Sequence, residues 1–539
     1  MVSKHKLDFG LFKQLIRYIS PWKKGLSFSL ILILLARSIE AWIPLRLGSL
    51  AQEILAYEKE SSYFIQEGLF LAGLLCLDYV LDALSVITKS WIGSKGLLEL
   101  RKEVFAHIQR QPFFFFDKER VGKLLTRVLH DVDQINQMFS ESVLPLIGSL
   151  VLFVLIFVGM FWLDYRIAIV ILLILPFLIL LTNYFRTIQR RGYEKIRDEI
   201  QEMNGFVQEH LQGVITIRRF GLQKEEGRIF REVNSRLSDA NMATTKNFGF
   251  YISANDFLQS LTYISAFILL SFSTPFDAGV FFAFTLYIGM IFRPLLDLAE
   301  RYNILQSAFA AAGRIFGILK LDPEVEKGKL LDEIRTIEFK DVWFSYNDKE
   351  WALKGVSFKI DPEERVGLIG KTGSGKTTIT ALILRFYTAQ KGQILINGEP
   401  IETFSPASIR KACSVILQDP VIFTGTIEEN VTLFDPSISS REAQKALDFV
   451  GFPKRASIGE GSLSSGEKQL LSLARAAAHP GRFLIMDEAT ANIDPPTEKK
   501  IEKALEKLTR GRGALIIAHR PSTINDLKRV ITLSHGEVI

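Results

Sequence analysis

An apolar strand runs into a glycine-rich turn in the stretch Val366-Gly-Leu-Ile-Gly-Lys-Thr-Gly-Ser-Gly-Lys-Thr377. The turn fits the pattern Gly-x-x-x-x-Gly-Lys-Ser/Thr at every fixed position, and a helical pattern follows over Ile379–Arg385. Glycines let backbone N–H groups converge on phosphate oxygens, and the N-terminal end of the helix adds its positive dipole. The stretch therefore predicts a nucleotide-phosphate site behind a buried strand of an α/β domain.

Two residues of this P-loop (residues 370–377) have different expected roles. Lys376 is expected to reach the β- and γ-phosphates, and the Thr377 hydroxyl to hold Mg²⁺. The expected ligands are therefore ATP and Mg²⁺. The residues expected to contact the nucleotide in this region are Gly370, Lys371, Thr372, Gly373, Ser374, Gly375, Lys376, Thr377 and Thr378.

Two further strand ends carry polar side chains. In Phe483-Leu-Ile-Met-Asp487-Glu488, Asp487 would orient Mg²⁺ through its waters and Glu488 would polarise an attacking water. In Leu515-Ile-Ile-Ala-His519, the histidine would contact the γ-phosphate. Alone, the Asp-Glu pair could be a polar strand cap and the histidine an ordinary surface or core residue. Because the three motifs occur in series, they favour ATP hydrolysis.

The first 320 residues have a different character. Hydrophobic residues make up 48% of the chain and include 41 Phe, a composition typical of lipid-facing surface. Ser142–Leu163, Ile167–Phe185 and Phe257–Phe276 each run for about a bilayer's thickness without a charge. Nothing comparable recurs after about Ala312. The net charge of +6 fits basic cytoplasmic loops better than nucleic-acid binding.

The expected organisation is an all-α transmembrane domain over 1–320 with long cytoplasmic helical extensions, a linker over 321–334 and the α/β P-loop ATPase domain over 335–539. An amphipathic helix over 8–20 is expected to lie in the interface and is favoured over a signal peptide. An even number of spans places the N-terminus and the ATPase domain both in the cytoplasm. The six spans are expected at about 25–55, 63–91, 137–163, 166–186, 250–275 and 278–297.

Charged side chains interrupt the first two spans. Arg37 and Asp82 lie at similar expected depths and could form a structural ion pair. Alternatively, Asp78 and Asp82, which share a helical face, could line a cavity and attract cationic substrates. The two cysteines, Cys76 and Cys413, lie in different domains, so a disulfide is not expected.

Leu463-Ser-Ser-Gly-Glu467 is similar to the signature motif of the ATP-binding cassette (ABC) exporters. Gln418-Asp-Pro resembles the Q-loop of that family, and Ala491-Asn-Ile-Asp494 its D-loop. Tyr346 matches the aromatic residue that stacks on adenine. Over nearly its whole length, the chain resembles a half-transporter of the multidrug and lipid exporter type, with six membrane helices and one cassette that has its own helical subdomain.

The resemblance implies that two chains work together. Ser464 and the Gly466 backbone would act on ATP held by the P-loop of a second half-transporter. ATP would close the cassettes because it binds the closed state better. The sets implied are Glu488, His519 and Gln418 for catalysis; Thr377, Gln418 and Asp487 for Mg²⁺; and Tyr346, Ser464, Gly466 and Asp494, besides the P-loop residues, for the nucleotide.

Two cytoplasmic turns resemble the segments through which this family transmits nucleotide state to its membrane helices. Both segments keep helical periodicity and carry few helix breakers apart from these turns. The matching residues are Phe116, Asp117, Gly122, Arg127 and Asp131 in the first turn, and Glu209, Gly213, Ile217 and Phe220 in the second.

The chain departs from the family pattern at its signature, which usually reads Leu-Ser-Gly-Gly-Gln. Ser465 adds a Cβ near phosphate and Glu467 adds negative charge, so both should weaken closure over ATP. An altered signature beside an intact Glu488 resembles heterodimeric exporters, and a heterodimer is favoured over a homodimer. The family also normally continues beyond the position of Ile539 with a helical tail that helps cassettes to pair.

The expected function is ATP-driven export of a small amphipathic molecule, drug, lipid or peptide across the cell (inner or plasma) membrane. Import by the same fold and a cassette-gated channel or regulator are the alternatives. The expected partners are a second half-transporter and the lipid bilayer, and no nucleic acid.

Overall fold

The computed structural model describes residues 9–56, 59–272, 277–347, 349–453, 463–479, 481–487, 494–517, 527 and 529–539; the side chains of 9, 292–300 and 302 are not among those described. The chain divides into two compact units. The helical unit comprises the chain up to Ile108 together with Gly122–Lys320, and the sheet unit comprises Gln109–Val121 together with Leu321–Ile539.

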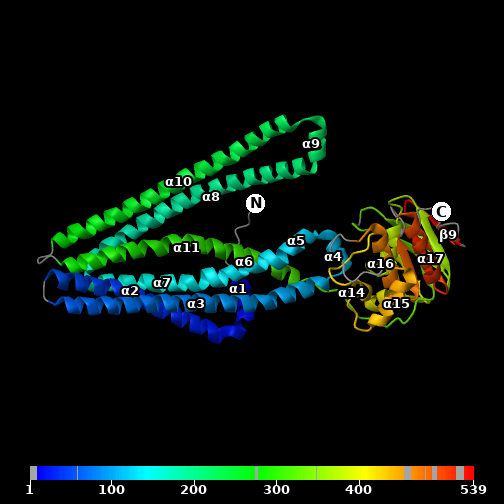
Figure 1. The fold of residues 1–539 in the computed structure, drawn as a ribbon, viewed down its shortest axis with the longest axis horizontal. Coiled ribbons are helices and arrows are strands. Elements are labelled where there is room, and N and C mark those ends of the chain that lie inside the picture. The colour runs from blue at the N-terminus through cyan, green and yellow to red at the C-terminus, as the bar shows by residue number, and fades with distance from the viewer. Residues whose placement is uncertain are drawn as a thin grey trace. The chain divides into compact units, whose positions relative to one another are not determined.

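Long helices build the helical unit (Figure 1). Their lengths follow from the sequence, because the polar segments between the apolar spans contain few helix breakers. The elements are α1 (Phe9–Ile19), η1 (Ser20–Trp22), α2 (Lys23–Leu55), α3 (Ser61–Gln109), α5 (Val121–Thr126), η2 (Arg127–Asp131), α6 (Val132–Gln137), η3 (Met138–Val143), α7 (Leu144–Leu163), α8 (Tyr165–Gln212), α9 (Val214–Phe220), α10 (Gln223–Ser271) and α11 (Ala278–Leu319).

Helix starts in this unit follow from local capping. The Asp164 carboxylate accepts a hydrogen bond from the Arg166 N–H (2.8 Å) at the start of α8, and Asp277 accepts one from the Val280 N–H (2.9 Å) at the start of α11. The short helix α9 ends at Gly221, which adopts the left-handed conformation at φ 68°. Figure 1 shows α8 and α10 side by side, joined through α9.

The core of the helical unit lies where α2, α7, α8, α10 and α11 converge. Tyr287 of α11 is fully buried there and donates a hydrogen bond from its hydroxyl to the Ala41 carbonyl of α2 (2.7 Å). Its neighbours include Ile156, Met160, Ile167, Ala266 and Phe284. Helices α2 and α11 also approach closely at two glycines. A Cβ added to Gly48 would lie 2.6 Å from the Gly279 carbonyl oxygen.

Among the described residues, four helices are long and apolar enough to cross a bilayer: Gly10–Leu55, Ser61–Gln109, Val121–Leu163 and Tyr165–Gln212. The sixth expected span falls in α11, where Ala278–Ile291 is an apolar stretch that directly precedes the side chains outside the described set. Within the described part of the chain, α10 is long enough but not apolar enough to count among these helices, although it contains most of the fifth expected span. Asn255, Asp256 and Gln259 interrupt its apolar stretch, and the helix ends at Ser271.

Two sheets organise the sheet unit. The smaller, antiparallel sheet has the order β2-β1-β4-β5, and the larger has the order β10-β9-β3-β8-β7-β6 with β9, β3, β8, β7 and β6 parallel. The strands are β1 (Ile337–Phe344), β2 (Leu353–Ile360), β3 (Arg365–Gly370), β4 (Lys391–Ile396), β5 (Glu399–Pro400), β6 (Cys413–Ile416), β7 (Phe483–Asp487), β8 (Ala514–Ile517), β9 (Arg529–Ser534) and β10 (Glu537–Val538).

Helices cover the larger sheet and form two apolar cores. One core packs α12 between the two sheets, around Val366, Leu368 and Ile379. The other packs α14–α17 against β6–β8, around Leu471, Leu484 and Ile501. The helices of this unit are α4 (Phe113–Lys118), α12 (Lys376–Ile383), η4 (Ile401–Thr403), α13 (Pro406–Ala412), α14 (Ile427–Thr432), α15 (Ser440–Val450), α16 (Ser465–Ala478) and α17 (Pro495–Thr509).

The short helix α4 belongs to the sheet unit although it follows α3 in the chain. The Phe113 ring of α4 stacks on Phe386, with 4.5 Å between ring centroids. The expected linker is also held in this unit, because the Lys329 N–H donates to the Thr403 carbonyl (2.8 Å). The boundary between the units after Lys320 coincides with the start of the expected linker.

Candidate nucleotide site and coupling elements

The candidate nucleotide residues gather at one edge of the larger sheet. Ile517 of β8 pairs with Leu368 of β3 on one side and with Asp487 of β7 on the other. Because these strands are parallel, the P-loop and Asp487 emerge from the same edge, about 10 Å apart across two strand spacings. Gln418 follows β6, the next strand along, and is exposed. The geometry thus brings Gln418, Asp487 and the P-loop together.

The P-loop has the backbone of a phosphate cradle. Gly373 and Gly375 adopt φ values of 81° and 105°, which favour glycine, and a Cβ on Gly375 would lie 2.6 Å from Leu353 Cδ2. The Lys376 Nζ turns into the loop and donates to the carbonyls of Gly370 (2.7 Å) and Lys371 (3.0 Å). The Ser374 Oγ is buried and has no hydrogen-bond partner among the described residues. An orphaned buried hydroxyl in a glycine-rich turn at the start of a helix suits a phosphate oxygen.

The residues expected to hold Mg²⁺ fit that ion. Mg²⁺ usually keeps several waters and takes one or two carboxylates together with substrate phosphates. Thr377 is exposed in the first turn of α12, Asp487 is half-buried at the end of β7, and the exposed Gln418 carries an amide oxygen. No cluster of three or more His, Cys, Asp or Glu occurs in the described ranges, so a cage made of protein ligands alone is not indicated there.

Tyr346, the residue expected to stack on adenine, stands beside the P-loop. Its side chain is 48% exposed, and its hydroxyl donates to the Thr378 Oγ1 (3.1 Å). The edge of the ring meets Tyr387, with 5.1 Å between centroids and 88° between planes. An exposed aromatic face held next to the P-loop provides a surface on which a base can stack.

The signature begins α16 and shows a feature that the sequence interpretation missed. Ser464 is the N-cap, and Ser464 and Glu467 form a capping box. The Glu467 carboxylate accepts from the Ser464 N–H (2.9 Å) and from the Ser464 hydroxyl (3.1 Å). Gly466 is buried in the first turn. The spacing Ser-x-x-Glu is a known helix-start pattern and could have indicated this role.

Asp494 is the N-cap of α17. Hydrogen bonds from Thr497, including one from its N–H (3.1 Å), hold the pKa of the Asp494 carboxyl below its usual value. The other D-loop residues, 491–493, and the expected catalytic residues Glu488 and His519 lie outside the described residues. Their assignments remain predictions.

The charges in the first two spans pair only in part. The Arg37 guanidinium donates to the Asp82 Oδ1 (2.9 Å) and also contacts Glu40. Arg37 and Asp82 thus form the ion pair that the sequence suggested as one alternative. The Asp78 Oδ1 is buried and has no hydrogen-bond partner among the described residues. Asp78 therefore remains the candidate for attracting a cation.

The two expected coupling turns are short helices. Phe116 and Asp117 lie in α4, and Ile217 and Phe220 lie in α9, which follows Gly213. Past α4, the Asp131 carboxylate accepts hydrogen bonds from Arg127 (2.8 Å) and from Arg314 of α11 (2.5 Å). Arg127–Asp131 is a π-helical turn, a distortion often found at functional sites.

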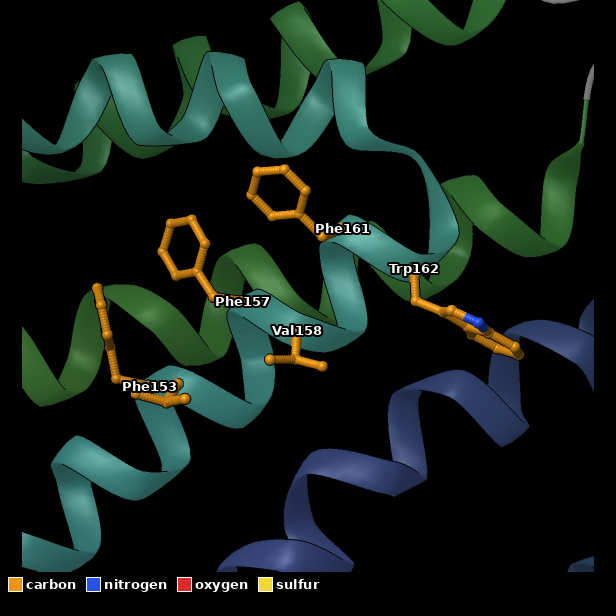
Figure 2. Close-up of a pocket in the computed structure, with 6 residues that line it drawn as sticks. Phe153, Phe157, Val158, Phe161 and Trp162 are labelled. Carbon is orange, nitrogen blue, oxygen red and sulfur yellow. The ribbon is translucent and has the colours of Figure 1, made fainter.

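An open hollow of about 620 Å³ lies beside α7 (Figure 2). Figure 2 shows Phe153, Phe157 and Phe161 on one side of the helix and Val158 and Trp162 on the other. Its lining residues are Phe153, Val154, Phe157, Val158, Phe161 and Trp162. This lining is apolar and fits a hydrocarbon group, but it offers no means of selecting a polar head group.

A P-loop sheet edge with a signature-like helix, fused to helices of membrane length, defines a membrane ATPase of the cassette type. Two family models match the chain: the ABC transporter transmembrane region over residues 26–295 and the ABC transporter cassette over residues 353–491. The chain belongs to the ABC transporter family and has the half-transporter arrangement of its exporters. It binds ATP, and its hydrolysis of ATP is coupled to transport across a membrane.

Relatives match nearly the whole chain. The "ATP-dependent lipid A-core flippase" of Haemophilus influenzae (strain Rd) is 30% identical over 98% of this chain and 93% of its own. The "Probable multidrug resistance ABC transporter ATP-binding/permease protein YheH" of Bacillus subtilis (strain 168) is 35% identical over 82% of this chain and 68% of its own. The solved structure of a bacterial Atm1-family ABC exporter with ATP bound matches the fold with a TM-score of 0.75 at 22% identity, covering 96% of this chain and 94% of that one.

Proposed function

We propose that the chain exports a small amphipathic molecule, such as a drug, lipid or peptide, and works as one half of a dimer. The observation that carries the proposal is the sheet edge where the P-loop, Asp487 and Gln418 meet, because it supplies the parts of an ATP-hydrolysing site. Two relatives are named a lipid A-core flippase and a multidrug resistance transporter, which favours an amphipathic cargo. The apolar hollow beside α7 suits the hydrocarbon part of such a cargo.

In this proposal each residue at the edge has a role. Lys376 leaves the carbonyls of Gly370 and Lys371 and turns to the β- and γ-phosphates. Thr377, Asp487 and Gln418 would hold Mg²⁺, and the ion would supply positive charge to neutralise the phosphates. Glu488 polarises the attacking water, and His519 contacts the γ-phosphate. Tyr346 stacks on the adenine.

A second chain completes the site. Ser464 and Gly466 lie at the start of α16 and act on ATP held by the partner. Asp494, the last residue of the D-loop, is expected to contribute to the nucleotide site as well. The turn helix α9 supports dimerisation independently, because its side chains Ile215 and Phe220 are 78% and 68% exposed. Apolar side chains on a cytoplasmic turn favour burial against a partner. We assign that partner surface to the cassette of the second chain.

The altered signature favours a heterodimer. A different chain with an intact signature would cover ATP held by this P-loop, while Ser465 and Glu467 would weaken the other site. The test is the chain purified alone in lipid nanodiscs. A heterodimer predicts little ATPase activity, which rises when the signature is restored by Ser465→Gly with Glu467→Gln. Robust ATPase activity by a stable dimer of the unaltered chain would contradict the heterodimer proposal.

The cell membrane is the proposed location, with the N-terminus and the sheet unit in the cytoplasm. The support is the cluster of basic residues at the end of the fourth expected span, which includes Arg186, Arg190 and Arg191. Protease added to right-side-out vesicles should then leave the sheet unit intact, and inside-out vesicles should lose it.

Transport can be tested in reconstituted vesicles with a fluorescent phospholipid and a cationic aromatic dye as probes. Export predicts MgATP-dependent accumulation inside inside-out vesicles, and Glu488→Gln should abolish it. Accumulation only in right-side-out vesicles with MgATP supplied in their lumen would instead support import. A channel or regulator would pass its probe down a gradient without continuous hydrolysis.

A further inference from the structure

Arg410 of α13 ties the linker to the body of the sheet unit. Its guanidinium forms two hydrogen bonds with the Glu324 carboxylate, at 2.7 and 2.6 Å, and its side chain is 29% exposed. Paired N–H donors in a planar fork fix both side chains in one orientation. Glu324 lies five residues after Leu319, the last residue of α11, so this contact holds the chain shortly after it leaves that helix.

Arg410 also fixes the segment behind α12. It donates to the carbonyls of Leu384 (3.1 Å) and Arg385 (3.1 Å), and its guanidinium carbon lies 4.8 Å from the centroid of the Phe386 ring. Carbonyl bonds and a cation–π contact from one planar group leave the Phe386 ring little freedom.

Phe386 is the surface on which α4 docks. The Phe113 ring stacks on it with 4.5 Å between centroids and 21° between planes, so Phe113 and Arg410 contact the same ring. Tyr387 meets the same Phe113 ring edge-on, at 6.2 Å. The Glu324 N–H donates to the Arg110 carbonyl (2.7 Å), in the residue after α3 ends. The linker and the docked helix therefore share one small network.

We propose that Arg410 is the positioning residue through which the sheet unit holds two membrane helices at once. It holds the linker from α11 through Glu324, and it holds α4, which continues from α3, through Phe386 and Phe113. The proposal rests on the proposed function, because nucleotide binding must first move the sheet unit. Arg410 touches no nucleotide residue in these contacts, so its role is to pass motion on.

The test is hydrogen–deuterium exchange of the full dimeric protein in nanodiscs, with and without Mg²⁺ and the non-hydrolysable analogue AMP-PNP. In Arg410→Lys the charge stays, but the fork and the ring contact are lost. The sheet unit should respond to AMP-PNP as in the wild type. The response of the helical unit should fall at least about fivefold, the low end of coupling between sites.

Matched variants sharpen the result. Arg529→Lys is the control, because Arg529 also bonds a carbonyl (Lys359, 2.9 Å) and a carboxylate (Glu364, 3.3 Å). Neither of these two bonds involves α4 or the linker. It should leave both responses unchanged. Phe113→Leu should lose only the part of the response that passes through α4, so its loss should be smaller than that of Arg410→Lys. The double variant should lose no more than Arg410→Lys alone, since the contact of Phe113 with Phe386 is one of the two branches that depend on Arg410.

Folding is checked by alkylation of Cys413 in a Cys76→Ser background. Cys413 is buried, and burial raises the pKa of its thiol to about 12, so it should resist maleimide while the sheet unit is folded. If Arg410→Lys fails this check, Glu324→Gln carries the test, with a smaller loss that reflects the linker contact alone.

Three results would overturn the inference. A wild-type response of the helical unit in Arg410→Lys would remove its role in coupling. An equal loss in both units would make Arg410 a purely structural residue of the sheet unit. If the sheet unit of the wild-type protein shows no change in exchange with AMP-PNP, the proposed function itself is wrong. The wild type alone gives this result, so it is distinct from any failure of the variants.

Discussion

The Glu467 carboxylate engages both hydrogen-bond donors of Ser464, the backbone N–H and the hydroxyl. The carboxylate thus stabilises the start of α16, where negative charge also suits the helix dipole. Of these two donors, the Ser464 hydroxyl is the one that the proposed dimer would use on the partner's ATP, together with the Gly466 backbone. Glu467 is therefore favourable for the helix, and in the proposed dimer it would be unfavourable for closure over ATP.

Glu467→Gln should tighten MgATP binding in the dimer. Glutamine also serves in capping boxes, so the helix should keep its stability while a full negative charge near phosphate disappears. At a few ångströms, removal of such repulsion is worth roughly 1–4 kcal/mol before screening. We expect about three- to tenfold tighter binding in a nucleotide titration, because 1.4 kcal/mol is tenfold.

The matched control for this prediction is Glu442→Gln. Glu442 forms the same capping box with Ser439 at the start of α15, outside the nucleotide site. It should leave MgATP affinity unchanged. Equal shifts in both variants would mean that the effect arises from helix stability and not from charge beside phosphate.

The Arg37 and Asp82 pair predicts different effects for two neighbouring aspartates. Asp82→Asn leaves Arg37 without its 2.9 Å partner and should lower the unfolding temperature. The loss of unfolding free energy should be smaller than the roughly 3–5 kcal/mol expected when one partner of a fully buried ion pair is removed, because both side chains keep exposed surface. Asp78→Asn should leave that temperature unchanged.

Asp78→Asn should instead weaken stimulation of ATPase activity by a cation. Tetraphenylphosphonium and an uncharged aromatic compound of similar size are the paired probes. A selective loss for the cation would place Asp78 in the path of cationic cargo. Equal losses for both probes would show that Asp78 is structural.

At the residue scale, the sequence predicted the P-loop and Asp487 because fixed spacing and strand ends encode them locally. It could not predict Arg410 or Phe386, whose roles depend on contacts with residues far away in the chain. Glu324, for example, is 86 positions from Arg410. Glu467 was noticed only for its charge, although the Ser-x-x-Glu spacing also encodes a cap.

At the element scale, the crossing of α2 and α11 depends on glycine. Gly48→Ala would place a Cβ 2.6 Å from the Gly279 carbonyl oxygen and 2.8 Å from the Ala283 Cβ. The helices would have to separate, and overpacking typically costs about 1–3 kcal/mol. We expect a lower unfolding temperature of the purified protein in detergent.

The control for the helix crossing is Gly73→Ala in α3, where an added Cβ would meet nothing within 4 Å. Alanine also favours the helical conformation, so this variant should unfold no earlier than the wild type. If both alanine variants unfold at the same temperature, the close approach of α2 and α11 does not stabilise the fold.

Elements were predictable wherever one periodic pattern ran without interruption. The long helices α3, α8 and α10 follow from polar segments that contain few breakers, and capping aspartates start α8 and α11. The docking of α4 in the sheet unit was not predictable from periodicity, because the stacking of Phe113 on Phe386 joins segments far apart in sequence. Sequence similarity alone suggested a coupling role there.

At the scale of the whole molecule, ATP binding and transport belong to different units of one chain. In the proposed coupling, the linker and α4 carry a change from one unit to the other. The sheet edge would supply the phosphate chemistry, and in the proposed dimer the partner's signature would complete it. Transport in the proposed dimer therefore depends on hydrolysis for which Glu488, the residue after Asp487, is the expected catalytic group.

The most direct measurement is MgATP hydrolysis and MgATP binding by Glu488→Gln in one preparation of the reconstituted transporter. Removal of the group that polarises water should lower hydrolysis at least about a hundredfold. MgATP affinity should be kept, whereas Lys376→Ala should lose binding as well. Hydrolysis by Glu488→Gln at the wild-type rate would contradict the account.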